Sequence, residues 1–141
     1  QVPRRGHHAR SKHDVWFRHG QPLGRFGGGL SMSPLTKPLI DHRIYTIALR
    51  KMPEFLEVFN TLAMPVLMET LGHPVGFYTS WVGPQNQFVH LWAYDDLADY
   101  ERRCRARDTH PDFGAYLKAS GHLITAQETR LIRAVDMPGL K

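Results

Sequence analysis

The stretch VGFYTSWVGPQNQFVHLWAY, residues 75–94, decides the fold of this chain. Two runs rich in aromatic and β-branched residues, 75–82 and 87–94, flank the short segment GPQN at 83–86. Runs of this composition favour strands, and a short connection of Gly, Pro and Asn between them is typical of a β-hairpin. The sequence therefore predicts an antiparallel pair of strands over these residues.

Helical patterns lie on both sides of this hairpin. Before it, a helix is expected to begin at Pro53 and to end at Gly72, because apolar residues recur at helical spacing between them. Pro65 should kink this helix or divide it near Met64, since proline removes a backbone donor.

A polar, arginine-rich helix is expected to follow the hairpin at residues 97–107, with Asp95 or Asp96 as its cap. A break at 109–111 separates it from a short helix at 112–120. The arginine run in the first of these helices is interpreted as a solvated face.

Two further runs, IDHRIYTIAL at 40–49 and TAQETRLIRAV at 125–135, complete the pattern as a first and a last strand. The order is β-α-β-β-α-β when the two short helices after the hairpin count as one helical segment. This is the order of the ferredoxin-like α+β fold, in which an antiparallel sheet carries helices on one face.

Alternation along the strand at 87–94 sorts its side chains onto two faces of the sheet. One face carries the large residues Phe88, His90, Trp92 and Tyr94, and the other carries the smaller residues Gln87, Val89, Leu91 and Ala93. We expect the smaller set to pack under the helices and the aromatic set to lie on the uncovered face. Because soluble monomers rarely expose so large an apolar patch, the pattern predicts a homodimer whose two sheets meet and enclose a cavity.

Charge separates a basic tail from a neutral body. The chain has 141 residues and a formal net charge of +5, and residues 1–35 hold six Arg or Lys against one acid. The rest of the chain holds 12 basic and 12 acidic side chains, so no nucleic-acid surface is expected there. Residues 1–35 are rich in Gly and His and have no apolar periodicity, which predicts a disordered tail before a folded domain at 36–141.

Composition also argues against several kinds of site. The single cysteine, Cys104, allows neither an internal disulfide nor a thiolate metal cluster. No apolar run is long enough to span a membrane. The histidines are scattered without carboxylates at ligand spacing, so neither a metal nor a cofactor is expected.

Several short motifs resemble those of the NIPSNAP family. They are Arg43-x-Tyr45, HLWAYD at 90–95 and QETR at 127–130, and the similarity extends over residues 40–135. The resemblance implies a dimeric α+β barrel, a fold shared with cofactor-independent monooxygenases, but it implies no single activity. Members of the family are associated with vesicular traffic and mitochondrial quality control. A single domain is more typical of bacterial members, so a cytoplasmic location is expected, with the mitochondrial matrix as the alternative.

His90 is the candidate catalytic base, because an imidazole titrates near neutral pH and the pattern places it on the aromatic face. The candidate helpers, able to grip a carboxylate or to polarise a carbonyl, are Arg43, Tyr45 and Arg130. Structural roles are the alternatives, with His90 bonded to Glu128 or to a tyrosine and each arginine paired with a nearby acid. The predicted ligand cavity is lined by Phe77, Trp81, Phe88, Trp92, Tyr94 and Glu128.

Two functions of different kinds are consistent with these residues. The first is a binding or scaffold protein that holds a small hydrophobic or aromatic ligand between the sheets of a homodimer. The alternative is a cofactor-independent monooxygenase or isomerase that uses His90 with arginine and tyrosine helpers. An enzyme requires His90 and one helper to reach a common point, whereas a binding protein requires only the cavity.

Overall fold

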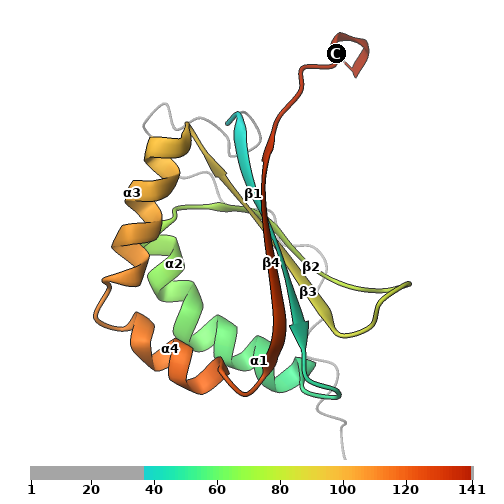
Figure 1. Ribbon diagram of the computed structural model, residues 1–141, viewed down its shortest axis with the longest axis vertical. Coiled ribbons are helices and arrows are strands. Elements are labelled where there is room, and N and C mark those ends of the chain that lie inside the picture. Colours follow the sequence, from blue (N-terminus) through green and yellow to red (C-terminus); the bar gives the residue numbers. More distant parts are fainter. Residues whose placement is uncertain (1–36, 141) are drawn as a thin grey trace, which may run out of the picture. The chain divides into compact units, whose positions relative to one another are not determined.

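One antiparallel sheet of four strands carries helices on a single face (Figure 1), which confirms the predicted ferredoxin-like fold. The computed structural model describes residues 37–140, so the predicted tail at 1–35 lies outside the described residues. The strands are β1 (Leu39–Ile47), β2 (Pro74–Thr79), β3 (Gln87–Tyr94) and β4 (Ile124–Arg133), in the order β2-β3-β1-β4. The helices are α1 (Met52–Val58), the π-helical turn η2 (Phe59–Ala63), α2 (Met64–Thr70), α3 (Leu97–Asp108), α4 (Phe113–Ser120) and the 3-10 turn η3 (Pro138–Leu140).

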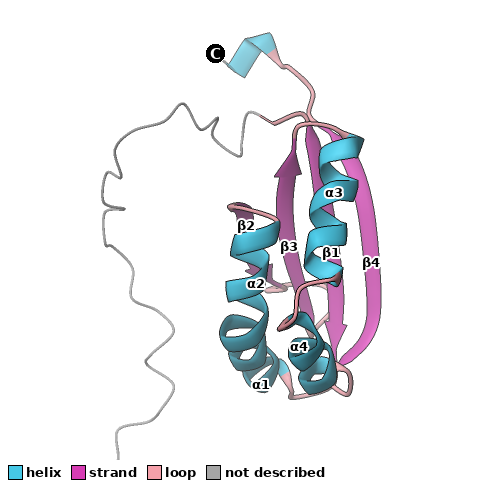
Figure 2. Ribbon diagram, turned by 90° about the vertical axis from the view of Figure 1, so that its left-hand side faces the viewer, coloured by secondary structure: helices cyan, strands magenta, loops and turns pink. Residues whose placement is uncertain are grey.

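The helices cover the sheet unevenly (Figure 2). The α1 and α2 helices lie over β2 and β3, whereas α3 and α4 lie over β1. The β4 strand pairs with β1 at the edge of the sheet and has no helix in front of it, so almost all of its residues are exposed. The layer between helices and sheet is therefore open along β4.

The helix before the hairpin is divided at the position that Pro65 predicts. The α2 helix begins at Met64, and the preceding turn is π-helical. Pro65 has no N–H to donate, and the wider π turn accommodates it within one helical path. The helix ends before Gly72, which has a φ of +86° and donates its N–H to the Leu67 carbonyl at 3.2 Å. Both predicted signals are confirmed.

The loop of the hairpin is longer than predicted. The β2 strand ends before Ser80, whose N–H donates to the Gln87 carbonyl at 3.0 Å. Two loop residues, Gly83 (φ +105°) and Asn86 (φ +61°), take left-handed conformations and turn the chain back. Trp81 therefore lies in the loop with no strand partner to align it, and it is 90% exposed. The prediction that Trp81 lines a cavity beside the strand aromatics is wrong.

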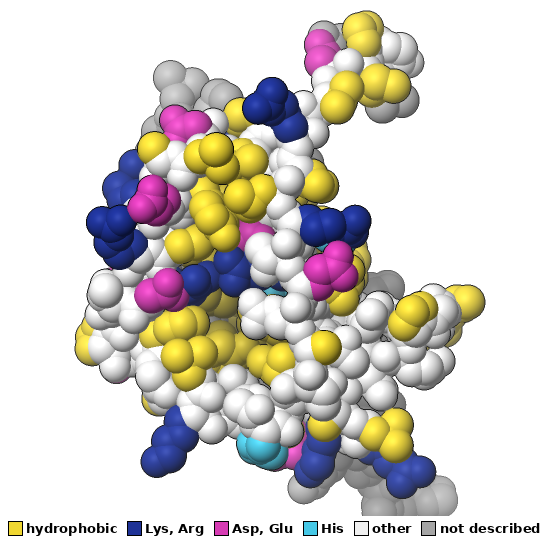
Figure 3. All heavy atoms as spheres, in the orientation of Figure 1, with side chains coloured by type: hydrophobic (Ala, Val, Ile, Leu, Met, Phe, Trp, Pro, Cys, Tyr) yellow, Lys and Arg dark blue, Asp and Glu magenta, His cyan; other side chains and the backbone are white. Residues whose placement is uncertain are grey.

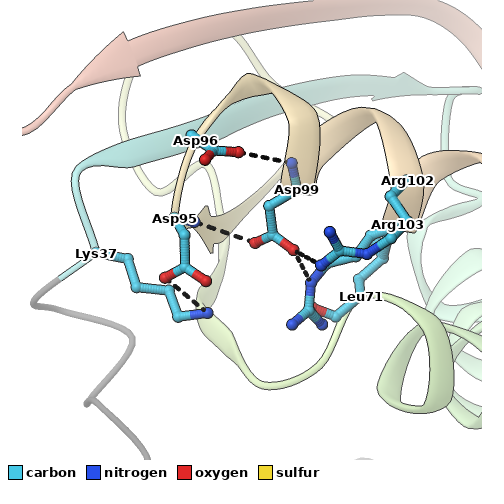
Figure 4. Close-up of polar contacts among 7 residues, drawn as sticks. All are labelled: Lys37, Leu71, Asp95, Asp96, Asp99, Arg102 and Arg103. Carbon is cyan, nitrogen blue, oxygen red and sulfur yellow. Dashed lines mark hydrogen bonds and ion pairs between the residues drawn. The ribbon is translucent and has the colours of Figure 1, made fainter.

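A network of carboxylates holds the beginning of α3 (Figure 4). The Oδ1 atom of Asp96 accepts a hydrogen bond from the Asp99 N–H at 2.8 Å, which confirms Asp96 as the cap. The Asp99 carboxylate accepts in turn from the Asp95 N–H at 3.0 Å and from Nε of Arg103 at 2.8 Å. Arg103 also donates from Nη1 to the Leu71 carbonyl at 3.2 Å. The network therefore ties the start of α3 to the end of α2.

The helices cover the aromatic face of the sheet, and the prediction that they cover the face of small side chains is wrong. The aromatic residues of β3 are between 0% and 3% exposed, namely Phe88, His90, Trp92 and Tyr94. Large rings on the helical segment fill the layer above them, since Phe59 and Phe55 lie 4.9 Å and 5.2 Å from the Phe88 ring. The size of the strand side chains did not determine which face of the sheet the helices cover, because large rings on the helices pack against the large rings of the strand.

The uncovered face carries the alternate residues of the strands. Its apolar members are Ile40, Ile44, Val89, Leu91, Ala93 and Ile132. Polar side chains lie among them, because Nη2 of Arg130 is 3.3 Å from Nδ1 of His42 and its Nε is 3.5 Å from Glu128. This face is therefore a mixed surface with an apolar centre and no helix over it.

Candidate functional site

A cavity of about 260 Å³ lies between the helices and the β1–β4 side of the sheet. Its apolar wall is formed by Phe59, Leu67, Leu71, Phe113, Leu117 and Ile124. Its polar wall is formed by Arg43, Tyr45, Arg107, Asp108, Tyr116, Ser120 and Gln127. Figure 3 shows this side of the molecule, where dark blue side chains cross the hollow between two areas of yellow side chains. The cavity thus combines apolar walls with a band of positive charge.

The β1 strand supplies the most deeply buried charge of the cavity. Arg43 is 7% exposed, and its Nε donates to Oδ2 of Asp41 at 2.9 Å on the same face of the strand. Burial acts to lower the pKa of Arg43, but Asp41 and Tyr45 outweigh it, so the pKa is raised and the guanidinium stays charged. Oδ1 of Asp41 has no hydrogen-bond partner among the described residues. Burial raises the pKa of Asp41, against the opposing effect of Arg43.

The α3 helix supplies a second guanidinium from the helix side. The side chain of Arg107 is 12% exposed, and its Nε donates to Asp108 at 2.8 Å. Its guanidinium carbon lies 5.5 Å from the centre of the Phe113 ring, within the range of a cation–π contact. Burial and the charge of Arg43 act to lower the pKa of Arg107, but the hydrogen bond to Asp108, together with the smaller electrostatic effects of Cys104 and Asp108, outweighs them and the pKa is raised.

Two buried tyrosines belong to the polar wall, Tyr45 from β1 and Tyr116 from α4. Tyr116 is 4% exposed, and its hydroxyl has no hydrogen-bond partner among the described residues. Burial raises the pKa of Tyr116, so the hydroxyl keeps its proton at neutral pH. A buried hydroxyl without a partner costs stability, and this one belongs to a side chain of the cavity wall.

His90 is not part of the cavity wall and packs among aromatic rings, 4.7 Å from the centre of the Tyr45 ring. Its Nδ1 accepts a hydrogen bond from the indole Nε1 of Trp92 at 2.8 Å. A neutral ring that accepts at Nδ1 carries its proton on Nε2, so neither nitrogen offers a free lone pair. Burial, and then the charge of Arg43, lower the pKa of His90 to about 3. Burial thus keeps His90 neutral, and its hydrogen-bond partner is Trp92 rather than Glu128 or a tyrosine.

Only part of the predicted site comes together. Two of the candidate helpers, Arg43 and Tyr45, line the cavity. Arg130 and Glu128 lie on the uncovered face, because Tyr45 pairs with Gln127 and adjacent residues of a strand point to opposite faces. The predictions that Arg130 acts beside the other helpers and that Glu128 lines the same cavity are therefore wrong.

The predicted aromatic lining belongs to the protein core. Phe88, Trp92 and Tyr94 are buried beneath the helices. Phe77, at the β2 edge, stacks on Phe88 with 6.0 Å between the ring centres. None of these four side chains is part of the cavity wall. Phe88, Trp92 and Tyr94 pack in the same core cluster as residues of β1 and of the helices.

Arg107 and Tyr116 line the cavity although the sequence did not predict either of them as a site residue. A signal for Arg107 was present, since Asp99, Arg103 and Arg107 recur at every fourth position and so share one side of α3. The interpretation of the arginine run as a solvated face holds for Arg105, which is exposed. For Tyr116, helical spacing indicates a buried side of α4 but gives no sign of a cavity.

Two other kinds of site are absent from the described part of the chain. Residues 37–140 contain no group of three or more His, Cys, Asp or Glu side chains arranged to hold a metal ion. Within the same range, no helix is both long enough and apolar enough to cross a bilayer. The cavity beside β4 brings buried charges and apolar walls together and is the candidate site of the described domain.

The sequence and the fold are similar to those of known proteins. The family model described as NIPSNAP matches residues 40–138, and no curated protein matches the chain. A NIPSNAP family protein of unknown function from Agrobacterium tumefaciens is 25% identical, with a TM-score of 0.67 over 70% of this chain and 89% of that chain. A NIPSNAP-like domain protein from Burkholderia xenovorans is 26% identical, with a TM-score of 0.66 over 69% of this chain and 84% of that chain. A putative antibiotic biosynthesis monooxygenase from Nitrosomonas europaea is 11% identical, with a TM-score of 0.52 over 70% and 99%, and is similar in fold alone.

Proposed function

The chain belongs to the NIPSNAP family, and we propose that it is a homodimeric protein that binds a small, largely apolar molecule in a cavity within each subunit. The observation that carries the proposal is the cavity of about 260 Å³, in which apolar side chains surround a few buried polar groups. Ligand sites are typically concave and mostly apolar, with a small number of polar groups that orient the ligand. The cavity is slightly smaller than the usual size range of roughly 300–1,000 Å³, so the ligand is small.

A second copy of the chain is the proposed cover of the open sheet face. Apolar side chains such as Ile44, Leu91 and Ile132 lie on that face, and α1 to α4 all lie on the other side. Two such faces that meet about a twofold axis bury both apolar sets. The ligand is then expected within a subunit rather than between the sheets, because the cavity is on the helix side and opens beside β4.

The geometry does not favour the alternative of a cofactor-independent monooxygenase or isomerase with His90 as base. A general base needs a free lone pair within reach of the substrate and a pKa near the working pH. His90 uses its Nδ1 lone pair for Trp92, and its pKa of about 3 leaves it a weak base. A likeness in fold to a putative monooxygenase carries no activity with it.

The proposed location is the cytoplasm. The NIPSNAP proteins reported above come from the bacteria Agrobacterium tumefaciens and Burkholderia xenovorans. Their bacterial origin supports the cytoplasm over the mitochondrial matrix.

Titration with naphthalene probes tests binding in the cavity. The probes 2-naphthoate and its neutral analogue 2-naphthamide are titrated into the full-length protein by calorimetry. Leu117 lies at the rim of the cavity and is 54% exposed, so Leu117→Trp should fill the opening and weaken binding by about tenfold or more. Ala115→Trp, at an exposed position of the same helix outside the cavity wall, is the matched control and should keep the wild-type affinity. The proposal fails if neither probe binds or if both variants behave alike.

A further inference from the structure

The geometry points to a ligand that carries a carboxylate, which Arg43 and Arg107 bind together while its apolar body lies against the surrounding rings. The inference rests on the proposed function, because it names the chemical class of the ligand for the same cavity. The observation behind it is that two guanidinium groups, from β1 and from α3, share one small and mostly apolar space.

Two cations in one cavity destabilise the protein when no anion lies between them. Arg43 and the side chain of Arg107 are 7% and 12% exposed, so water screens their repulsion only in part. The charge of Arg43 acts to lower the pKa of Arg107, as expected for two cations that line the same cavity. A carboxylate between them offsets the repulsion and accepts charge-assisted hydrogen bonds from both.

The acids beside the two arginines leave donors for a ligand. Asp41 accepts from Nε of Arg43 and is not part of the cavity wall. Asp108 accepts from Nε of Arg107, and its own side chain is largely exposed, so solvent screens its charge. Both contacts use Nε, whereas a guanidinium presents further N–H donors in a rigid fork. Most of these donors can therefore serve a second planar acceptor such as a carboxylate.

The hydroxyl of Tyr116 is a second, independent indication of an anionic ligand. Tyr116 belongs to the cavity wall and is buried, and its hydroxyl has no hydrogen-bond partner among the described residues. The hydroxyl can donate to a carboxylate oxygen, which is a stronger acceptor than any neutral oxygen. One carboxylate thus satisfies two guanidinium groups and an unpartnered donor.

The apolar wall disfavours a bare inorganic anion. Phe59, Leu71 and Phe113 lie around the arginines, and they offer no hydrogen bonds to a fully hydrated ion. The Phe113 ring also lies against the Arg107 guanidinium, so the charged and apolar parts of the wall adjoin. A compact aromatic or branched monocarboxylate matches both parts.

The matched pair of acid and amide probes tests this inference. We expect 2-naphthoate to bind the full-length protein about tenfold or more tightly than 2-naphthamide, which has the same shape without the charge. Arg107→Gln should remove most of this preference, because the variant loses far more affinity for the acid than for the amide. Arg105→Gln, on the same helix and paired with Glu101 at the surface, is the control and should keep the preference. Arg107 is chosen because the loss of Arg43 would leave Asp41 buried without its partner.

The outcomes separate this inference from the proposed function. Equal affinity for the acid and the amide overturns the inference of a carboxylate ligand and leaves the proposed binding function intact. Failure of both probes to bind overturns the inference and the proposed function together. Inorganic phosphate, as a third probe, should not bind, and phosphate binding that depends on Arg107 would replace the carboxylate with a phosphate site. Tyr116→Phe removes a single oxygen atom and gives a second measurement that does not depend on the arginine. It should reduce the preference for the acid, and an unchanged preference counts against the inference.

Discussion

At the scale of single residues, the hydrogen bond between Trp92 and His90 sets the chemistry of the imidazole. The bond of 2.8 Å occupies Nδ1, and burial with the charge of Arg43 lowers the pKa of His90 to about 3. A histidine in an unfolded chain has a pKa of about 6.5. The ring therefore stays neutral in the folded protein at pH values where the unfolded chain already takes up a proton.

Acidification from pH 7 to pH 5 is expected to destabilise the protein through His90. Between about pH 6.5 and pH 3 the unfolded state binds more protons than the folded state, so the free energy of unfolding falls as the pH falls. The contribution of His90 is about 2 kcal/mol between pH 7 and pH 5. His90→Asn keeps an acceptor for the Trp92 indole and removes the titration, so its free energy of unfolding should depend less on pH. Urea denaturation at both pH values measures the difference.

The control for this prediction is His73, an exposed histidine. His73→Asn should keep the pH dependence of the wild-type protein. Parallel pH curves for the wild-type protein and His90→Asn would show that His90 is not held neutral in the fold.

At the scale of elements, one side of α3 packs against the rest of the domain and the other side faces solvent. Arg103 donates to the end of α2, and Arg107, one turn later, lies in the cavity wall. Arg105 points to solvent between them and forms a surface ion pair. The cap at Asp96 fixes where the helix begins, so it also positions the arginine at the other end.

Asp96→Ala is expected to lower the free energy of unfolding by about 1 kcal/mol, because the Asp99 N–H loses its acceptor. For a domain of this size the melting temperature should fall by roughly 4 °C. Asp95→Ala is the matched control, since the Asp95 carboxylate forms an ion pair with Lys37 at 3.5 Å at the surface. Its effect should stay below about 0.5 kcal/mol. Equal losses in the two variants, measured by thermal and urea denaturation, would rule out the cap as the dominant contact.

At the scale of the whole molecule, the two faces of the sheet have different partners. The aromatic face is covered by helices of the same chain. The open face is the surface on which we propose that a second copy of the chain binds. A charge on the covered face, as in Trp92→Asp, should unfold the subunit, because it buries an unpaired carboxylate in the core. A charge on the open face should instead act on assembly alone.

Leu91→Asp is therefore expected to weaken the homodimer and to leave the subunit folded. Leu91 lies on the open face, opposite His42 of β1, where a dimer would remove the new carboxylate from water. Sedimentation velocity at micromolar concentration measures the association, and circular dichroism checks the fold. Leu97→Asp, at an exposed position on the helix side, is the control and should remain dimeric. A wild-type protein that sediments as a monomer would contradict the homodimer.

Removal of residues 1–35 is expected to change the melting temperature by less than about 5 °C. This segment carries the net charge of the chain and no apolar periodicity, whereas every helix and strand of the described residues 37–140 lies outside it. About 1 kcal/mol moves the melting temperature of such a domain by a comparable amount, so a larger fall would mean that the segment packs on the domain. Differential scanning calorimetry of both chains makes the comparison.

The sequence by itself determined the order of the elements and most of their ends. Pro65 divides the first helical segment, Gly72 ends it and Asp96 caps α3, because each signal acts through the backbone of a few neighbouring residues. Alternation also placed Arg43 and Tyr45 on one face of β1, since the side-chain period of a strand is fixed. The motifs identified the family, which the match over residues 40–138 confirms.

Only the tertiary structure decided which face the helices cover and therefore where the site lies. Alternation separates two sets of side chains without saying which set is inside, and both sets here are apolar enough to be buried. The choice depends on the path from β1 through α1 and α2 to β2, which brings Phe55 and Phe59 against Phe88. In the same way, Arg43 on β1 and Arg107 on α3 share a cavity because distant segments pack together. No local pattern encodes that meeting, since it arises from the packing of whole elements.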